Sequence, residues 1–459
     1  MRQKILLCLI NVVILFTGCS AKETETVPII PKATGGMEKE PILEYTIPDC
    51  APGILVNQAG YKIEDKKVAI FRGKTLPDTF HVCNAETGEV VFEGNLELRG
   101  SDKVTGEQIG YAGFTEVQTP GEYYIESDIL GYSYTFPIND KIYKELLEQN
   151  ILRLHTKVEN RESLTEEEIT NTCKAVTNIL IAFEMHGEIF GDDLGIQESG
   201  NEIPDLIDIL HSQIILLSEQ KEIVLSSADW EMVSYYASAI AKFSYTYKEY
   251  DSVFATSCLQ LADSVWRYME RNASQVDGKF RFMAAAELYR VSGGGKYHNY
   301  IKEYCRNTEE PVNAEREAVY GAVTYIATRQ QVDMDICARF MKEIMNEAEE
   351  ISAQTGSSFY QVNITADQKN NDEIMWDMVV LTIVDHVISN HEYATIIENH
   401  LHYLLGRNSM AISYVDGVGE RDYSVKEGQQ SIMDGGFKES ALLFMLSEVN
   451  DRDIEEEQE

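Results

Sequence analysis

The apolar residues of this chain follow two different periods, and the change falls near residue 140. From residue 54 to residue 138, short β-branched or aromatic runs are separated by Gly, Pro, Asp and Asn, which predicts the strands of a small β-sandwich. Asn84 and Gly88 bound one predicted hairpin turn, and Pro120 with Gly121 forms a second.

After residue 140 the apolar positions recur every three or four residues, as in Val176, Ile179, Leu180 and Phe183, and this spacing predicts helices up to residue 449. Counted between polar breaks, they number twelve, or six helical hairpins. An open solenoid and a closed (α/α)6 barrel both satisfy this pattern. The predicted helices span residues 140–157, 165–186, 203–220, 228–248, 251–271, 280–292, 296–305, 315–328, 334–353, 372–389, 391–405 and 434–449.

The first 19 residues have the layout of a signal peptide: Arg2 and Lys4 precede an apolar run that is too short for an ordinary membrane-spanning helix. The run ends in Phe-Thr-Gly-Cys, which resembles a bacterial lipoprotein box with Cys19 as the lipid anchor. A plain secretory signal stays open as the alternative. Residues 20–52 are rich in Thr, Pro, Lys and Glu and predict a flexible tether.

The composition excludes some classes of binding partner. The net charge of −37 over 459 residues argues against nucleic acid, because phosphate binding needs clustered Lys and Arg, and against acidic polysaccharides. Beyond Cys8 and Cys19 the cysteines are scattered without a Cys-x-x-Cys spacing, so no disulfide framework is indicated. Cys258 lies in a helical apolar pattern and is predicted to be a buried free thiol.

Several segments together resemble glycoside hydrolase family 9, the cellulases and related β-glycanases. The most telling is Phe190 to Leu210, where Glu198-Ser-Gly-Asn-Glu-Ile-Pro-Asp205 runs into an amphipathic helix. Residues 283–289, 402–408 and 413–420 match further blocks of the family, whereas residues 55–61 and 120–124 match the immunoglobulin-like domain that precedes many of its catalytic barrels.

The resemblance favours ring closure and implies this order: a lipoprotein signal at 1–19, a tether at 20–52, an immunoglobulin-like β-sandwich at 53–139, an (α/α)6 barrel at 140–450 and an acidic tail at 451–459. It implies a structural role for the β-sandwich, with sugar binding as the alternative. Tyr123, Tyr132 and Tyr134 alternate as core strand residues do and need no ligand.

Family 9 enzymes invert the anomeric carbon, with a carboxylate base and a carboxylic acid held roughly 6.5–9.5 Å apart. The resemblance places the base motif, Asp-Ala-Gly-Asp, on residues 161–164, which read Arg-Glu-Ser-Leu and carry neither aspartate. The following residues predict a helix start capped by Ser163 or Thr165. Glu162, Glu166 or Glu167 is left open as a displaced base.

The family acid falls on Asp434, one methylene shorter than the usual glutamate, and a helix cap is the alternative role for this aspartate. The family's His-x-Arg sugar-binding segment has no counterpart, since no histidine follows His402. Trp376 and Tyr414 lie in segments that border the family cleft, so the resemblance makes them candidate substrate-binding residues. A core position is the alternative for both.

No cofactor is expected. The loop residues Asp192, Asp193, Glu198, Asn201 and Asp205 offer oxygen ligands for a hard cation, but they lack a calcium-loop spacing, so a structural calcium is left open and not indicated. We therefore expect an extracytoplasmic, membrane-anchored lipoprotein that resembles family 9, acts on β-linked polysaccharide and has impaired or altered catalysis. The alternative is a non-catalytic surface module that binds glycan or protein.

Overall fold

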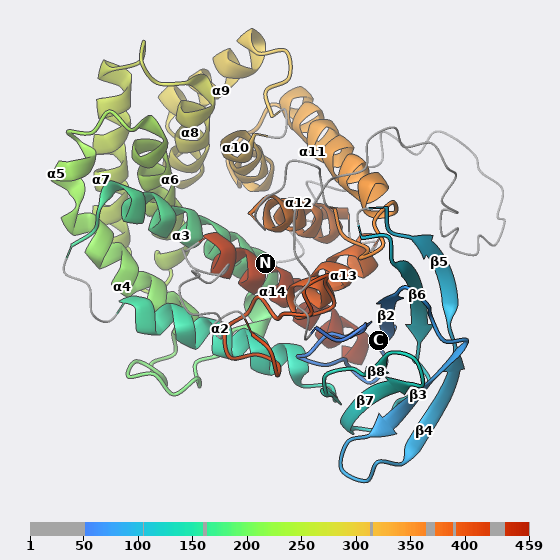
Figure 1. The fold of residues 1–459 in the computed structure, drawn as a ribbon. Helices are drawn as coiled ribbons and strands as arrows, with labels where there is room; N and C mark the ends of the chain where they lie inside the picture. The colour runs from blue at the N-terminus through green and yellow to red at the C-terminus, as the bar shows by residue number, and fades with distance from the viewer. Residues whose placement is uncertain are drawn as a thin grey trace. The chain divides into compact units, whose positions relative to one another are not determined.

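The computed structural model describes residues 51–103, 105–158, 163–312, 315–363, 372–388, 392–422 and 437–458 (Figure 1). The chain divides into two compact units. Unit 1 comprises His155–Glu349, and unit 2 comprises the described residues before and after that segment. Each unit is treated by itself.

Unit 2 begins with two antiparallel sheets, as the period of two predicts. One sheet has the strand order β1-β2-β6-β5, and the other has the order β4-β3-β7-β8 with β9 also pairing with β7. The strands are β1 (Ile54–Leu55), β2 (Val68–Gly73), β3 (Thr79–Asn84), β4 (Val90–Asn95), β5 (Glu97–Ser101), β6 (Gln108–Gly113), β7 (Gly121–Ser127), β8 (Gly131–Tyr132) and β9 (Phe136–Ile138).

The two sheets enclose a hydrophobic core that contains Ile54, Phe71, Phe80, Val82 and Ile125 among other buried residues. The alternation along each strand places these side chains on the inward face, and their burial stabilises the sandwich.

The first predicted hairpin turn is confirmed. The Asn84 carbonyl accepts the Gly88 N–H at 2.8 Å, and the Asn84 side chain accepts the Thr87 N–H at 2.9 Å. Gly88 has a φ of 70°, a left-handed conformation that glycine adopts without steric cost. The second predicted hairpin, at Pro120 and Gly121, is wrong, because β6 and β7 belong to different sheets and the turn joins the sheets.

The three alternating tyrosines differ in their solvent exposure. Tyr123 is buried at 2% exposure, and Tyr134 packs against the core from its edge. Tyr132 is 65% exposed, so its predicted core position is wrong. It pairs with Glu126 at the end of the short β8 strand, where that side of the sheet is open.

Unit 2 also holds the helices α12 (Asp372–Ile388), α13 (Ala394–Leu404) and α14 (Phe437–Gln458), with most of α2 (Ile142–Val158). Within it, α12 packs against both α13 and α14. Helix α14 continues to Gln458, beyond the predicted end at residue 449.

Helices are the only regular secondary structure in the described residues of unit 1, and every helix predicted there is confirmed. Helices α6, α8 and α10 are buried along most of their length, whereas α7 buries one stripe at spacings of three and four. The helices are α3 (Glu166–His186), η1 (Gly187–Ile189), α4 (Asp205–Glu219), α5 (Lys221–Val224), α6 (Trp230–Tyr247), α7 (Ser252–Arg271), α8 (Gly278–Ser292), α9 (Gly295–Asn307), α10 (Arg316–Ala327) and α11 (Met334–Thr355).

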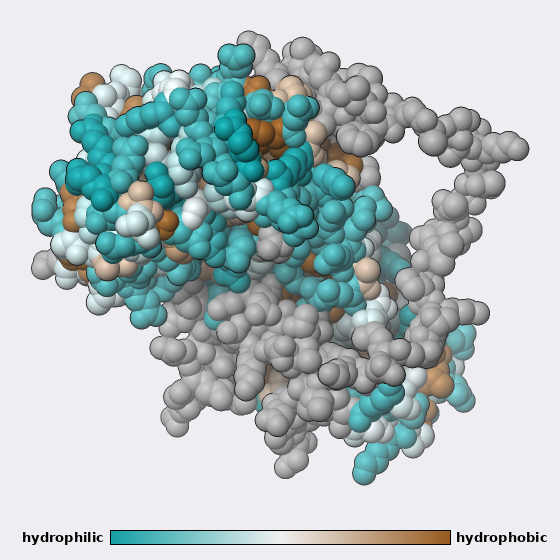
Figure 2. All heavy atoms as spheres, turned by 90° about the horizontal axis from the view of Figure 1, so that it is seen from above, coloured by the Kyte–Doolittle hydropathy of each residue, from teal (hydrophilic) through white to brown (hydrophobic). Residues whose placement is uncertain are grey.

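The described cysteines Cys83, Cys173, Cys258, Cys305 and Cys337 are free and buried, which confirms the prediction for Cys258. The described surface in Figure 2 is mostly hydrophilic with small hydrophobic spots. Within the described ranges, none of the helices combines the length and hydrophobicity that crossing a bilayer requires.

Candidate functional site

The helices α3, α6, α8 and α10 of unit 1 are largely buried, and their N-terminal ends are joined to one another. We call these four N-terminal ends the rim. Side-chain contacts join each helix start to the next. They are Lys174 Nζ–Glu231 Oε1 at 2.5 Å, Ser234 Oγ to the Phe280 carbonyl at 2.6 Å, and Lys279 Nζ–Glu315 Oε2 at 2.5 Å.

Each of the first three helix starts is capped by its own residue. Thr165 and Glu168 form a reciprocal capping box on α3, in which the Thr165 Oγ1 accepts the Glu168 N–H at 3.2 Å and the Glu168 carboxylate accepts the Thr165 N–H at 2.9 Å. Asp229 accepts the Met232 N–H at 3.1 Å, and Asp277 accepts the Lys279 N–H at 3.0 Å. These bonds satisfy amides that would otherwise lack partners.

The rim is acidic, because carboxylates in the first turn are stabilised by the partial positive charge of a helix N-terminus. Glu166, Glu167 and Glu168 stand in the first turn of α3, and Glu317 stands in that of α10. Glu317 is 7% exposed and accepts the Tyr235 hydroxyl at 3.1 Å. Burial, followed by the charge of Glu317, raises the pKa of Tyr235 well above its ordinary value.

One hollow of about 680 Å³ lies between the starts of α3 and α6. Oxygen atoms dominate its walls, with Lys174 as the cation among the lining residues. The lining consists of Thr165, Glu166, Glu167, Thr170, Asn171, Lys174, Asp229 and Glu231.

This hollow lies beside Leu164, one of the residues on which the resemblance places the base motif. Leu164, aligned with the second aspartate of the motif, is 5% exposed and has no titratable group. Ser163 is exposed, and Thr165, not Ser163, caps the helix. Arg161 and Glu162 lie outside the described residues. Of the displaced bases considered, Glu166 and Glu167 are exposed and line the hollow.

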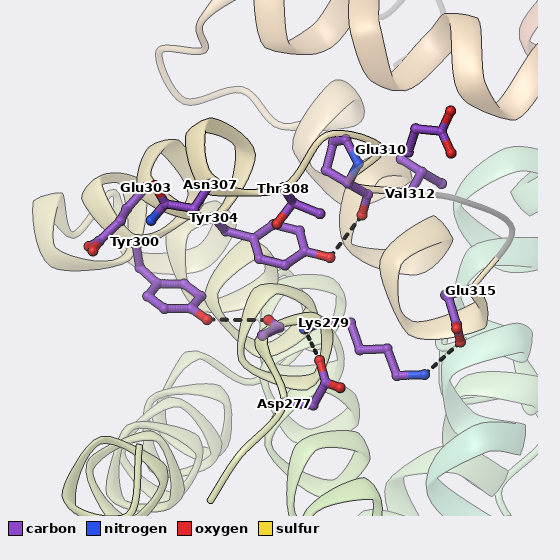
Figure 3. Close-up of a pocket in the computed structure, with 12 residues that line it drawn as sticks. Asp277, Lys279, Tyr300, Glu303, Tyr304, Asn307, Thr308, Glu310, Val312 and Glu315 are labelled. Carbon is purple, nitrogen blue, oxygen red and sulfur yellow. Dashed lines mark hydrogen bonds and ion pairs between the residues drawn. The ribbon is translucent and has the colours of Figure 1, made fainter. Parts of the chain in front are cut away.

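A second hollow, of about 470 Å³, lies between the start of α8 and the end of α9 (Figure 3). Tyr300 and Tyr304, one turn apart on α9, donate their hydroxyls to the carbonyls of Gly278 at 3.2 Å and Pro311 at 2.9 Å. Burial raises the pKa of Tyr300 to about 12. Both hydroxyls therefore act as fixed donors at neutral pH.

Below the rim, unit 1 contains buried ionic groups that sequence reasoning missed. Lys242 on α6 and Glu287 on α8 form an ion pair at 2.7 Å, with 1% and 2% of their side chains exposed. The Thr324 hydroxyl on α10 donates to Glu287 at 2.6 Å. The available signal was a single charged residue inside each of two apolar runs, Ala-Ile-Ala-Lys-Phe and Ala-Ala-Ala-Glu-Leu.

A second pair extends this cluster. Arg290 on α8 bonds Glu184 on α3 at 2.8 Å and lies over the Tyr245 ring at 3.9 Å from its centre. Burial alone would raise the pKa of Glu184, but the charges of Arg290 and Lys242 outweigh burial and hold that pKa below its ordinary value. The cluster links four helices, α3, α6, α8 and α10, and offers no open carboxylate for catalysis.

The polar loop before α4, residues 190–204, is held by carboxylates at Asp192 and Asp205. Asp205 is fully buried and accepts the Leu194 N–H at 2.6 Å and the Ser199 hydroxyl at 2.8 Å. Asp192 accepts the N–H groups of Gly200 at 2.6 Å and Glu202 at 2.7 Å. These oxygens therefore serve as turn and cap acceptors.

The remaining predicted residues belong to other parts of the chain. Trp376 on α12 is 6% exposed, and Tyr414 is 8% exposed with its ring 6.1 Å from that of Tyr403. Their role as substrate-binding residues stays a prediction. Asp434, the candidate acid, and Cys19, the candidate lipid anchor, lie outside the described residues.

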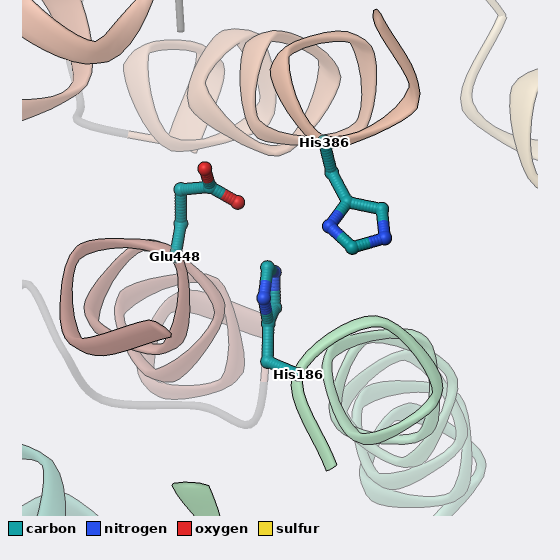
Figure 4. A group of neighbouring side chains, drawn as sticks. All are labelled: His186, His386 and Glu448. Atoms are coloured by element: carbon teal, nitrogen blue, oxygen red, sulfur yellow. The ribbon is translucent and has the colours of Figure 1, made fainter. Parts of the chain in front are cut away.

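A close pair of possible ligand side chains lies between two helices of unit 2. His386 on α12 and Glu448 on α14 project from facing helices, and their ligand atoms lie within 4.8 Å of each other (Figure 4). Glu448 is 2% exposed.

Two protein-family models match this chain. Residues 49–131 match the cellulase N-terminal ig-like domain, and residues 217–430 match glycosyl hydrolase family 9. The chain therefore carries a cellulase N-terminal ig-like domain followed by a glycosyl hydrolase family 9 domain.

Particular relatives are distant in sequence. A cellodextrinase of Butyrivibrio fibrisolvens is 21% identical and aligns with 81% of this chain and 85% of its own length. A cellulose 1,4-beta-cellobiosidase of Acetivibrio thermocellus is also 21% identical, over 83% of this chain and 59% of that protein.

Solved structures agree on the fold. A metagenome-derived glycoside hydrolase family 9 endoglucanase has a TM-score of 0.74 at 20% identity, covering 86% of this chain and 98% of the other. A Bacteroides ovatus GH9 structure has a TM-score of 0.69 at 15% identity, covering 87% and 99%. The predicted fold class, an immunoglobulin-like β-sandwich followed by a family 9 helical domain, is confirmed.

Proposed function

We propose that this protein is a surface lipoprotein that acts on β-glucan-type polysaccharide with impaired catalysis. The family 9 domain supports the substrate class, and so do the similar proteins, which include a cellodextrinase and a cellulose 1,4-beta-cellobiosidase. The start of α3 supports the impairment.

The observation that carries the proposal is the environment of Leu164. An inverting enzyme needs a base that takes a proton from water as the water oxygen bonds to the anomeric carbon, while an acid protonates the departing glycosidic oxygen. A buried leucine cannot take that proton, and the neighbouring Glu168 carboxylate is engaged by Thr165. The exposed Glu166 and Glu167 are the candidate bases among the described first-turn residues of α3, and no described hydrogen bond fixes either carboxylate.

Hydrolysis assays test this proposal. Release of reducing ends from hydroxyethyl cellulose and xyloglucan, both neutral polymers, would be compared for the wild type, Asp434→Ala and the double variant Glu166→Gln/Glu167→Gln. We expect slow hydrolysis in the wild type and a further loss in Asp434→Ala. Equal rates in wild type and Asp434→Ala would reject the assigned acid, and a rate typical of active family members would reject the impairment.

The second candidate function is a non-catalytic module that binds glycan at the cell surface. The same buried Leu164 favours it. Binding of hydroxyethyl cellulose without any reducing-end release would support this function over the first, whereas mutation-sensitive hydrolysis would exclude it.

The surface location rests on the first 19 residues and on Cys19. Metabolic labelling with a radioactive fatty acid tests it. We expect label in the wild-type protein and none in Cys19→Ala, which should also leave the membrane fraction. Unlabelled wild-type protein in the medium would instead indicate a plain secretory signal.

A further inference from the structure

The open face of the five-stranded sheet carries two tyrosines side by side. Tyr124 on β7 and Tyr132 on β8 have ring centres 5.6 Å apart, with the ring planes at 68°. Tyr132 lies directly opposite Glu126, and Tyr124 precedes Glu126 by two residues on the same strand. Since alternate residues share a face, both rings lie on the side of the sheet away from the core residue Ile125.

Polar groups continue this face across the neighbouring strands. His81 on β3 pairs in register with Glu93 on one side and Glu126 on the other, with ring nitrogens 4.0 Å and 3.7 Å from their carboxylates. Val90, 48% exposed, lies beyond Cys83 in the row that contains Tyr124. We call this surface the tyrosine face; it comprises His81, Val90, Glu93, Tyr124, Glu126 and Tyr132.

The exposure of Tyr132 is not required by the fold. The core of the sandwich is closed by residues on the opposite face of the same strands, such as Tyr123 and Ile125. A 65% exposed tyrosine beside a second ring, with an exposed valine on the same face, presents apolar surface to the solvent.

We propose that the tyrosine face binds a single chain of neutral β-linked glycan; the choice of glycan class rests on the proposed function. Aromatic rings pack against the C–H faces of pyranose rings, and carboxylates accept hydrogen bonds from sugar hydroxyls. Glu93 and Glu126 repel anionic polymers and anionic membranes, whereas hydroxyl groups complement them.

The angle between the rings selects the form of the glycan. Two rings inclined at 68° cannot both lie flat on one planar surface, such as a face of crystalline cellulose. A dissolved chain can present successive sugar rings in different orientations. The face therefore favours soluble glycan over crystalline polymer.

The test uses the full-length protein and two matched variants. Tyr124→Ala/Tyr132→Ala removes both rings, and Leu98→Ala removes a side chain of the other sheet that has the same 65% exposure as Tyr132. Affinity electrophoresis in gels containing hydroxyethyl cellulose or xyloglucan would measure binding, and pull-down with microcrystalline cellulose would measure binding to the crystal. Thermal unfolding confirms that each variant is folded.

We expect the double variant to lose about tenfold or more in affinity for the soluble glycans, while Leu98→Ala keeps wild-type affinity. Tyr132→Phe, which keeps the ring, should bind as the wild type does. Equal binding by wild type and double variant would overturn the tyrosine face and leave the proposed function standing. A wild type that neither binds nor hydrolyses any of these glycans would overturn both.

A protein partner predicts a different result. If the face mediated self-association, the double variant would lower the molecular mass measured by sedimentation at high concentration and leave glycan affinity unchanged. That outcome would also overturn the glycan proposal. Preferential binding to microcrystalline cellulose would overturn the inference drawn from the ring angle.

Discussion

The side chain of Gln58 accepts a hydrogen bond from the Arg421 N–H at 3.0 Å, although 363 positions separate the two residues in sequence. The same side chain donates to the Ala411 carbonyl at 3.1 Å, and the Gln58 N–H donates to the Leu405 carbonyl at 2.8 Å. The segment after β1 is thereby tied, within unit 2, to the chain that follows α13. That chain includes residues 413–420, which resemble a block of family 9.

Two glycines make room for this contact. Gly406 has a φ of 122° and Gly419 has a φ of 85°, and a Cβ at either position would meet the Gln58 side chain at 2.6 Å. A residue other than glycine would therefore be strained in its backbone and would also displace Gln58.

Gln58→Ala should destabilise the protein by about 2–4 kcal/mol, because it leaves the Arg421 N–H and the Ala411 carbonyl without their partner and opens a cavity. Chemical denaturation would measure the change. Gln118→Ala, at an exposed glutamine bonded to Glu64, is the matched control and should change stability by less than about 0.5 kcal/mol. Equal stability of the two variants would contradict the role given to Gln58.

The buried pair Lys242–Glu287 predicts a large asymmetry between single and double substitution. Lys242→Met leaves Glu287 charged, buried and without its cation, which should cost about 3–5 kcal/mol. Lys242→Met/Glu287→Leu removes both charges and should recover much of that loss. The exposed pair Lys144–Glu148 is the control, since its loss should cost at most about 1 kcal/mol. A double variant as unstable as Lys242→Met would refute the assignment.

His400 makes stability depend on pH. Its Nδ1 lies 2.8 Å from the Ile396 carbonyl, which only accepts, so Nδ1 carries the proton and Nε2 accepts the Asn363 N–H at 3.1 Å. This neutral form is fully buried, and burial, with a smaller effect from Arg407, lowers the pKa to about 4.

Because the folded pKa lies below the ordinary value of 6.5, the unfolded chain binds the proton first. The contribution of His400 to the free energy of unfolding is complete above pH 6.5 and falls by roughly 3 kcal/mol as the pH falls to about 4. His400→Gln cannot titrate and should flatten the pH dependence by that amount, as measured by urea denaturation at a series of pH values. Parallel curves for wild type and variant would exclude this role.

Asp205→Ala should loosen the loop before α4, because the Leu194 N–H and the Ser199 hydroxyl both lose their acceptor. Hydrogen exchange at Leu194 should accelerate by about tenfold or more, while Asp193→Ala, at an exposed aspartate of the same loop, should leave it unchanged. Chelation of divalent ions should not reproduce the effect. A wild-type loop that loosens on chelation would show that a bound cation holds it.

The helices were readable from the sequence because their signal is local. A period near 3.6 places one apolar stripe on each helix whatever its neighbour is, so each helix predicted in unit 1 lies where the stripe predicts. The buried ionic cluster was not readable. Lys242 and Glu287 are far apart in sequence, and only packing of α6 on α8 turns two isolated charges into a pair.

In the sheets, too, local features were predictable from the sequence and long-range pairing was not. Turn residues revealed that the chain turns at Pro120, but which sheet the next strand joins depends on strand pairing, and β7 joined the other sheet. The alternation of residues predicted on which face of the sheet Tyr132 lies. Its exposed fraction of 65% depends instead on which other residues cover that face. A two-residue strand at the end of β7 has too few neighbours for its pattern to decide this.

For the candidate site, the sequence by itself determined that neither aspartate of the family's base motif is present at residues 161–164. Residue identity is sufficient for that conclusion. Only the tertiary structure decided what stands there instead: Leu164 is buried, and Thr165 and Glu168 bond each other at the start of α3. Burial and hydrogen bonding depend on the surrounding helices, because a side chain's solvent access and partners are set by the packed neighbours and not by its own segment.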